Sequence, residues 1–302
     1  MADKARPVLI GGAHIDRIGY ALDGAATGTS APGRVDRSLG GVAFNVARLL
    51  RDLGEDVLLV SAFGEETDGR TLSAEAGEGL DIASAVPAGE GATATYHAII
   101  NPDGTLLGAV ADMAIYDRLL PPMLAPFEAL IRTAPLVFVD ANLPAATLTW
   151  VADLKRTGLF AADTVSTAKA GRLTDILSLL DVVFTNRSEA AELTGLTPRD
   201  AAARLCRLGA GGALVSDGAE ALAVAHGIEE PTLMPVQPAR VVDETGAGDA
   251  LVAGTLFGLL RGQDLDRAAQ TGLAAARLCI ETAGAALPNA CADAVVALTK
   301  DP

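Results

Sequence analysis

Short runs of apolar and β-branched residues alternate with helix-like segments along most of this 302-residue chain. In 42–53 the apolar residues recur at helical spacing, and Gly54 stands where a helix would end. Strands that alternate with helices form parallel sheets with helices on both faces. The sequence therefore predicts the α/β class, with a mostly parallel central sheet whose clearest strand candidates are 7–12, 57–61, 136–139, 182–185 and 213–216.

Polar residues stand at or just beyond the ends of several of these strands, namely Asp140, Asn142, Asn186 and Ser216. The carboxyl ends of parallel strands meet at one edge of a sheet, and ligands of open α/β sheets bind in the crevice at that edge. We therefore expect the functional site there.

Two regions, near 15–37 and 93–110, break the alternation of strands and helices. The second contains two strand-like runs joined by the turn 101–104. We interpret both regions as a small β-sheet lid that would cover a substrate and exclude water. The alternative is that 93–110 forms an edge hairpin of the main sheet. Apart from the lid, residues 1–302 are expected to form a single domain.

Composition narrows the possible functions. The formal net charge of −15 disfavours nucleic acid polymers as partners, although a small anion can still be held by main-chain amides. No apolar run is long enough to cross a bilayer and no secretory signal is recognisable, so we expect no membrane association and a cytoplasmic location. The odd number and wide spacing of the cysteines favour core positions over disulfides or a metal site for Cys206, Cys279 and Cys291.

Gly246, Ala247 and Gly248 lead through Asp249 into the apolar run 251–260. Unpaired N–H groups and the positive end of a helix dipole should converge at this point and bind an anion. Asp249 at the same entrance suits a catalytic base that takes a hydroxyl proton during phosphoryl transfer, and we expect the helix terminus to keep its carboxylate ionised. The alternative is a tight turn before a buried helix.

The string 243–250 resembles the C-terminal signature of the ribokinase-like (PfkB) kinases of carbohydrates and nucleosides. The resemblance implies a ribokinase-like sandwich, ATP and Mg²⁺ as cofactors, and Thr245, Gly246 and Gly248 beside ATP. Glu244 replaces the commoner threonine, which makes a direct role at that position doubtful.

Asp16, Gly40, Gly41 and Asn45 resemble the elements of this family that bind the sugar. A carboxylate and an amide can hydrogen-bond neighbouring hydroxyls, and paired glycines let the backbone approach a sugar closely. Without the family context, Asp16 could equally be a turn residue and Asn45 a capping or surface side chain.

Asn186 and Glu189 are three residues apart, which places them on one helix face. They resemble the element of this family that organises magnesium and its waters, for which amide and carboxylate oxygens are suited. The alternative is an ordinary helix cap with glutamate in the first turn.

Ser216 and Gly218 resemble the nucleotide loop of the family, although Ala221 stands where many members have a further glycine. After a helix predicted over 265–282, the segment 283–285 and Asn289 would lie near the adenine or near a loop that binds a monovalent cation such as K⁺. These residues complete the predicted nucleotide site.

The strings 111–116, 140–143 and 162–169 resemble the pseudouridine kinases of this family, which phosphorylate the 5′-hydroxyl of a C-glycosidic nucleoside. Asp112, Thr164 and Lys169 offer donors and acceptors for a uracil edge. Alternatively, Lys169 pairs with Asp163 or another carboxylate, and Met113 and Tyr116 are core residues. Other candidates are a ribokinase, another sugar or nucleoside kinase, and a catalytically silent sugar-binding protein.

Competing motifs are missing from the sequence. It has no G-x-x-x-x-G-K-[ST] string, no third glycine at dinucleotide-binding spacing, no zinc-like histidine spacing and no G-x-S-x-G elbow. His14 and His97 could line the sugar pocket, but a structural or solvated role is the simpler expectation. Because members of this family often pair through the lid, the resemblance also implies a homodimer.

Overall fold

A nine-stranded sheet forms the centre of the computed structural model, which describes residues 5–26, 28–87, 89–154, 158–282, 287 and 291–299. All neighbouring strands pair in parallel except at one edge, where β12 is antiparallel to both β11 and β13. The α/β prediction is confirmed, although the antiparallel edge was not predicted. The order is β13 (Thr232–Pro235), β12 (Ala221–His226), β11 (Gly212–Ser216), β10 (Val182–Asn186), β9 (Leu159–Asp163), β8 (Leu136–Asp140), β1 (Val8–Ile10), β4 (Val57–Ser61) and β5 (Leu80–Ser84).

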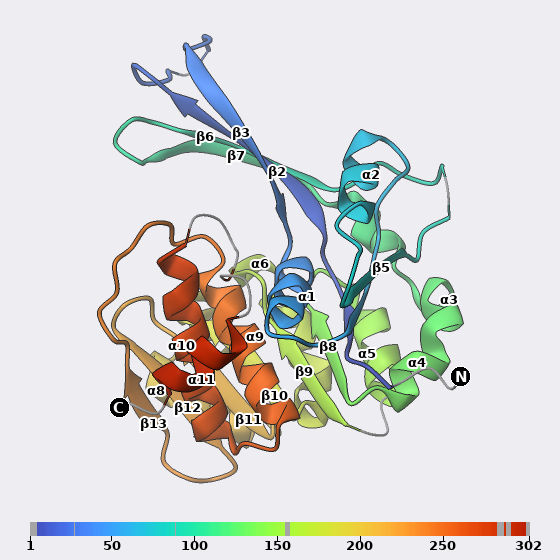
Figure 1. Ribbon diagram of the computed structural model, residues 1–302, viewed down its shortest axis with the longest axis vertical. Helices are drawn as coiled ribbons and strands as arrows, with labels where there is room; N and C mark the ends of the chain where they lie inside the picture. Colours follow the sequence, from blue (N-terminus) through green and yellow to red (C-terminus); the bar gives the residue numbers. More distant parts are fainter. Residues whose placement is uncertain are drawn as a thin grey trace.

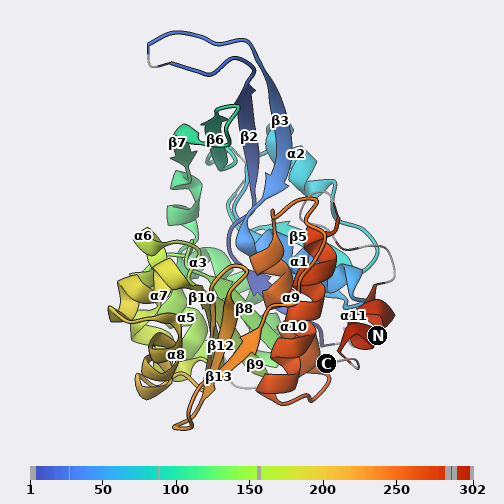
Figure 2. The ribbon, with the colours of Figure 1, turned by 90° about the vertical axis from the view of Figure 1, so that its left-hand side faces the viewer.

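Helices cover both faces of this sheet (Figure 2). Successive strand residues point to opposite faces, so Val8 and Ile10 join one hydrophobic cluster and Leu9 joins the other. One cluster is covered by α1 (Val42–Asp52), α9 (Ala247–Leu260), α10 (Leu265–Ile280) and α11 (Ala292–Leu298). The other is covered by α3 (Pro121–Leu124), α4 (Glu128–Thr133), α5 (Ala145–Leu154), α7 (Arg187–Thr194) and α8 (Pro198–Arg207), and α6 (Thr167–Ala170) packs against α7.

The predicted helix over 42–53 is confirmed as α1, and the turn that ends it contains Gly54. The N–H of Leu53 still bonds the carbonyl of Leu49, and Gly54 follows with φ of +92°, a conformation that costs glycine little. The helix predicted over 265–282 is α10, which ends two residues earlier.

Four strands form a second, small sheet in the order β3 (Gly33–Gly40), β2 (His14–Ala21), β6 (Thr95–Ile100) and β7 (Leu106–Asp112). It projects from the main body (Figure 1). The predicted turn joins β6 to β7, with Gly104 at φ of +82°. Because β6 pairs with β2, the alternative of an edge hairpin on the main sheet is wrong.

Two arginines of the small sheet tie it to α2 (Thr67–Ser73). Arg17 Nη2 donates to Asp68 Oδ2 at 2.6 Å, and Arg37 Nη2 donates to Asp68 Oδ1 at 3.1 Å. The paired guanidinium groups hold the pKa of the Asp68 carboxyl below its usual value, against the opposing effect of burial. These contacts fix the small sheet at the edge of the main body.

The strand order reverses between β1 and β8. From β1 the chain continues through β4 and β5 on one side, whereas β8, β9, β10 and β11 follow one another on the other side. Such a switch point opens a crevice at the carboxyl ends of the strands. Asp140, Asp163, Asn186 and Ser216 end four of these strands.

Two composition-based expectations can be compared with the structure. All three cysteines are buried, as predicted. Within the described ranges, no helix has both the length and the apolar character needed to cross a membrane.

Candidate active site

Asp140 is a fully buried carboxylate at the end of β8. Its Oδ2 accepts hydrogen bonds from the N–H of Gly12 at 2.8 Å and of Ala43 at 3.1 Å, and its Oδ1 accepts from the N–H of Asn142 at 2.9 Å. Burial raises its pKa, although these N–H groups oppose the rise. Asp140 thus joins the end of β1, the start of α1 and the loop after β8. It is buried at the edge of the sheet where the functional site was predicted.

The loop before α9 forms the predicted helix entrance. Gly246 precedes the helix with φ of +79°, and the first helical bond runs from Ala250 N–H to the Gly246 carbonyl at 2.8 Å. The N–H groups of Ala247, Gly248 and Asp249 therefore stand at the positive end of the helix dipole. Such an end suits an anion.

Asp249 is partly buried at this helix terminus, and its Oδ2 accepts a hydrogen bond from Asn45 Nδ2 at 2.7 Å. Desolvation raises its pKa to about 7, against the lowering effect of the Asn45 bond and with a further increase from Asp140. The expectation that the helix terminus keeps Asp249 fully ionised is therefore wrong. Burial outweighs the Asn45 bond and gives a carboxyl that is poised to exchange a proton near neutral pH.

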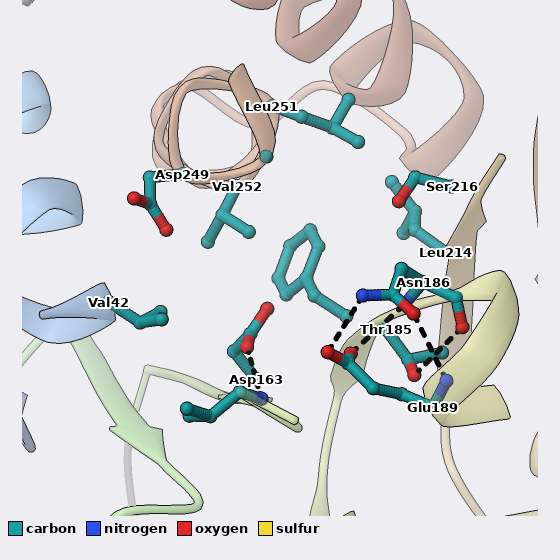
Figure 3. A pocket seen from close by; sticks show the side chains of 13 residues that line it. Val42, Asp163, Thr185, Asn186, Glu189, Leu214, Ser216, Asp249, Leu251 and Val252 are labelled. Atoms are coloured by element: carbon teal, nitrogen blue, oxygen red, sulfur yellow. Dashed lines mark hydrogen bonds between the residues drawn. The ribbon is translucent and has the colours of Figure 1, made fainter. Parts of the chain in front are cut away.

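A cavity of about 180 Å³ lies beside Asp249 (Figure 3). Asp249 and Val252 point into it from α9, facing Asp163 and the pair Asn186 and Glu189. The structure thus brings together residues from the predicted catalytic, nucleotide and metal groups. The cavity is lined by Val42, Asp163, Val165, Phe184, Thr185, Asn186, Glu189, Leu214, Ser216, Gly248, Asp249, Leu251 and Val252.

Asn186 and Glu189 form a complete capping box at the start of α7. Asn186 Oδ1 accepts from Glu189 N–H at 3.0 Å, and Glu189 Oε2 accepts from Asn186 N–H at 3.2 Å. Asn186 Nδ2 also donates to Glu189 Oε1 at 2.7 Å. The capping alternative is therefore correct as local structure, and it holds both side chains at the cavity wall.

Thr164 does not line the cavity. Its side chain is fully buried, and its hydroxyl donates to Glu189 Oε2 at 2.5 Å. The prediction that Thr164 binds substrate is wrong, because the side chain after the end of β9 points inward. Its observed contact instead orients the Glu189 carboxylate.

Asp163 was missed as a cavity residue. It ends β9 and its Oδ1 accepts from Val165 N–H at 2.7 Å. Burial, followed by repulsion from Glu189, raises its pKa well above the usual value. Val165 has φ of +64°, an unfavourable conformation for a β-branched residue. The strand end before 164–169 was the signal that could have identified Asp163.

The turn between β11 and β12 carries the predicted nucleotide residues. Ser216 lines the cavity, while Gly218 is exposed in the turn with φ of +57°. Arg187 forms a two-pronged ion pair with Asp217, which raises the pKa of Arg187 and lowers that of Asp217. This pair connects the start of α7 to the turn after β11. Thr245 is exposed before α9, and Asn289 with 283–285 lies outside the described residues.

Asp16 lies beside the junction of β3 with α1, where Gly40 and Gly41 are found. A Cβ atom on Gly40 would lie 2.3 Å from Asp16 Oδ2, and one on Gly41 would lie 2.3 Å from the Gly12 carbonyl oxygen. Gly41 also has φ of +108°. The close approach at both positions therefore requires glycine. It places Asp16 next to the end of β3, directly before α1, the helix that carries Asn45.

Lys169 is partly buried on α6 and donates to Asn142 Oδ1 at 2.5 Å. Burial lowers its pKa, with a further decrease from Arg172. The alternative ion pair between Lys169 and Asp163 does not occur. The buried Tyr116 is a core residue, as its alternative interpretation stated.

Asp112 does not share a face of the small sheet with Asp16. It is exposed on β7 and pairs across β6 with Thr95, which in turn pairs with Ile15. Directly opposed residues share a face, so Asp112 and Ile15 lie on the face opposite Asp16. The prediction that Asp112 binds substrate is therefore not met.

The comparisons with known proteins agree with this geometry. The model of the pfkB family of carbohydrate kinases matches residues 4–291. The chain belongs to this family. A pseudouridine kinase from Escherichia coli (strain K12) is 30% identical over 263 residues, covering 84% of this chain and 83% of the relative. An uncharacterised sugar kinase from the same strain is 30% identical over 301 residues, covering 96% and 82%.

Solved structures show the same fold. A carbohydrate kinase from Agrobacterium tumefaciens has a TM-score of 0.85 at 34% identity, covering 98% of this chain and 97% of that one. The ribokinase of Arabidopsis thaliana, complexed with ribose and ATP, has a TM-score of 0.85 at 21% identity and covers 99% of each. The chain is therefore a sugar or nucleoside kinase of the pfkB family with the ribokinase-like fold.

Proposed function

We propose that the protein transfers the γ-phosphoryl group of ATP to the 5′-hydroxyl of a nucleoside, with pseudouridine as the favoured acceptor. The observation that carries this proposal is the Asp249 carboxyl, whose pKa is about 7 and which faces the cavity from the N-terminus of α9. One small space thus contains a proton acceptor and main-chain donors for a phosphoryl group.

Asp249 would accept the hydroxyl proton as the acceptor oxygen bonds to phosphorus. Asn45 fixes the orientation of the carboxylate through the 2.7 Å bond to Oδ2, which leaves Oδ1 for the hydroxyl. The N–H of Gly248, which lines the cavity, would stabilise the charge that develops on the transferring group, and the N–H of Ala247 could join it only by leaving the Glu244 carbonyl oxygen at 3.3 Å. Positioning of this kind supplies most of the catalysis in phosphoryl transfer.

The cavity wall also suits Mg²⁺. Glu189, Asn186 and Asp163 offer oxygen atoms on one wall, but the described part of the chain has no group of three or more His, Cys, Asp or Glu residues arranged as a metal cage. Mg²⁺ fits such a site because it keeps several waters and shares substrate phosphates. When bound, it would neutralise phosphate charge. A monovalent cation such as K⁺ stays a family-based prediction.

The acceptor assignment rests on Lys169 and on the pseudouridine kinase from E. coli. An amine that is anchored by an amide oxygen keeps donors for the carbonyl groups of a base, which ribose lacks. A cytidine kinase from Thermococcus kodakarensis is 36% identical over 107 residues, or 35% of this chain. Other nucleosides are therefore the second candidates.

We also propose that the chain acts as one domain and pairs as a homodimer through the small sheet. Val35, Ile99 and Val110 share one face of this sheet and expose 70%, 45% and 68% of their surface. Pairing would bury this apolar face. Since the reaction consumes ATP, the cytoplasm is the proposed location.

The direct test is ADP formation with pseudouridine, uridine, cytidine, ribose and fructose, each with and without Mg²⁺. Asp249→Asn serves as the matched control. We expect the highest kcat/KM with pseudouridine. Phosphorus NMR of the product should show a 5′-phosphomonoester. A clear preference for ribose or fructose would overturn the assignment of pseudouridine as the acceptor. Saturable binding without ADP formation would indicate a catalytically silent sugar-binding protein.

A further inference from the structure

His14 lies between two polar side chains at the base of the small sheet. Its Nδ1 is 3.2 Å from the Tyr116 hydroxyl, and its Nε2 is 3.2 Å from Asp16 Oδ1. The side chains of His14 and Asp16 are only 15% and 24% exposed, and Tyr116 is buried in the core of the main body. A chain of polar contacts therefore runs from the core to Asp16.

The directions of the protons in this chain follow from the surroundings of Tyr116. Burial, together with repulsion from Asp140 and Asp16, raises the pKa of Tyr116 well above its usual value, so the phenol keeps its proton. The main-chain N–H of Ala13 also contacts the phenolic oxygen, and this hydrogen bond opposes the rise in the pKa of Tyr116. We assign the phenolic O–H as the donor to His14 Nδ1, which requires the neutral imidazole with its proton on Nε2.

A neutral histidine that accepts at Nδ1 carries its proton on Nε2. That N–H points to Asp16 Oδ1, while Oδ2 is not contacted by the imidazole and can accept from another donor. Gly40 leaves room for this arrangement, since a Cβ atom there would lie 2.3 Å from Asp16 Oδ2 and 3.1 Å from His14 Nε2. The Asp16 carboxylate is thereby fixed from one side, with its second oxygen in a defined place.

We propose that His14 is a positioning residue for the acceptor, which transmits the fixed direction of the Tyr116 hydroxyl to Asp16 and so orients the carboxylate toward acceptor hydroxyls. This proposal rests on the proposed function. It assigns His14 a task that is separate from proton abstraction by Asp249 and from the binding of ATP. The proposal predicts selectivity for acceptors with a ribosyl group whose hydroxyls can donate to Asp16 Oδ2.

Two substitutions separate the two contacts of the imidazole. The amide of His14→Asn can reach the place of Nδ1 and contact Tyr116, but it is too short to reach Asp16. The amide of His14→Gln can reach the place of Nε2 and donate to Asp16, but it abandons Tyr116. Binding of pseudouridine, uridine and ribose is measured by calorimetry, and KM and kcat are measured for the acceptor and for ATP.

We expect His14→Asn to raise the Kd and KM of the acceptor roughly ten-fold, as for the loss of a hydrogen bond to a charged group. His14→Gln, which keeps a donor to Asp16 but loses the contact with Tyr116, should weaken acceptor binding several-fold, less than His14→Asn and about as much as Tyr116→Phe, and KM for ATP should change by less than about two-fold in both. Tyr116→Phe should weaken acceptor binding several-fold in the wild type and have no further effect in His14→Asn.

The proposal is overturned if both His14 variants bind the acceptor like wild type. It is equally overturned if they raise KM for ATP as much as KM for the acceptor together with a lower melting temperature, because that pattern indicates a purely structural role. A wild-type enzyme that neither binds nor phosphorylates any acceptor would instead overturn the proposed function, and this inference with it.

Discussion

Replacement of Asp249 by asparagine separates the effect of its charge from the effect of its shape. The amide has nearly the volume of the carboxyl and can still accept the bond from Asn45 Nδ2. A pKa raised from 3.8 to about 7 means that the folded state binds a proton that the unfolded state has lost. Its contribution to stability is therefore fully present below about pH 4 and is lost as the pH rises to about 7.

At about 1.4 kcal/mol per pKa unit, this loss has an upper limit of about 4 kcal/mol. Asp249 is only partly buried, and solvent screening at such a residue reduces the figure, so we expect about 2 kcal/mol between pH 5 and pH 8. Asp140 and Asp163 also have raised pKa values. The informative quantity is therefore the difference in free energy of unfolding between wild type and variant at each pH.

Urea denaturation at pH 5 and at pH 8 measures that difference. As the pH rises from 5 to 8, we expect the free energy of unfolding of Asp249→Asn to increase by about 2 kcal/mol relative to that of the wild type. Turnover by the variant should be lower by at least about a hundred-fold. A difference that stays constant from pH 5 to pH 8 would refute the argument that burial raises the pKa of Asp249.

Three further predictions concern the neighbouring residues. Glu189→Gln should raise the Mg²⁺ concentration for half-maximal activity about ten-fold or more, and an unchanged Mg²⁺ dependence of ADP formation would remove Glu189 from the metal site. Gly40→Ala should push Asp16 aside and raise the acceptor KM while leaving KM for ATP unchanged; equal effects on both substrates would contradict this. Lys169→Met should raise KM for pseudouridine about ten-fold without changing KM for ribose, and a similar rise for ribose would show that Lys169 does not recognise the base.

Much of the framework was predictable because local patterns determine it. The spacing of apolar residues with Gly54 marked α1, and the glycines before 251–260 marked the entrance of α9. Asn186 and Glu189 are three residues apart, so their capping box was implied by their spacing alone. In each case neighbouring residues supply the decisive interaction.

Contacts between distant residues could not be read from these patterns. Asn45 bonds Asp249 across 204 residues, and His14 contacts Tyr116 across 102. Their pairing depends on how the elements pack. For the same reason, the dipole argument could not foresee how strongly burial raises the pKa of Asp249.

The errors at Thr164 and Asp112 have a common origin. Both residues were assigned to the acceptor because they carry hydrogen-bonding groups within strings that resemble pseudouridine kinases, but side chains alternate between the faces of a sheet. Asp163 therefore lines the cavity, while the next residue along the chain is buried against Glu189. On β7 the register places Asp112 on the face away from Asp16.

The pH dependence of ADP formation with pseudouridine tests most directly whether Asp249 is the base for phosphoryl transfer. The ionised carboxylate is the active form, so kcat/KM should fall about ten-fold per pH unit below about pH 7 and level off above it. Asp249→Asn should lower kcat/KM by at least about a hundred-fold and remove this dependence. A variant that keeps the rate and the pH profile of the wild type would contradict the account.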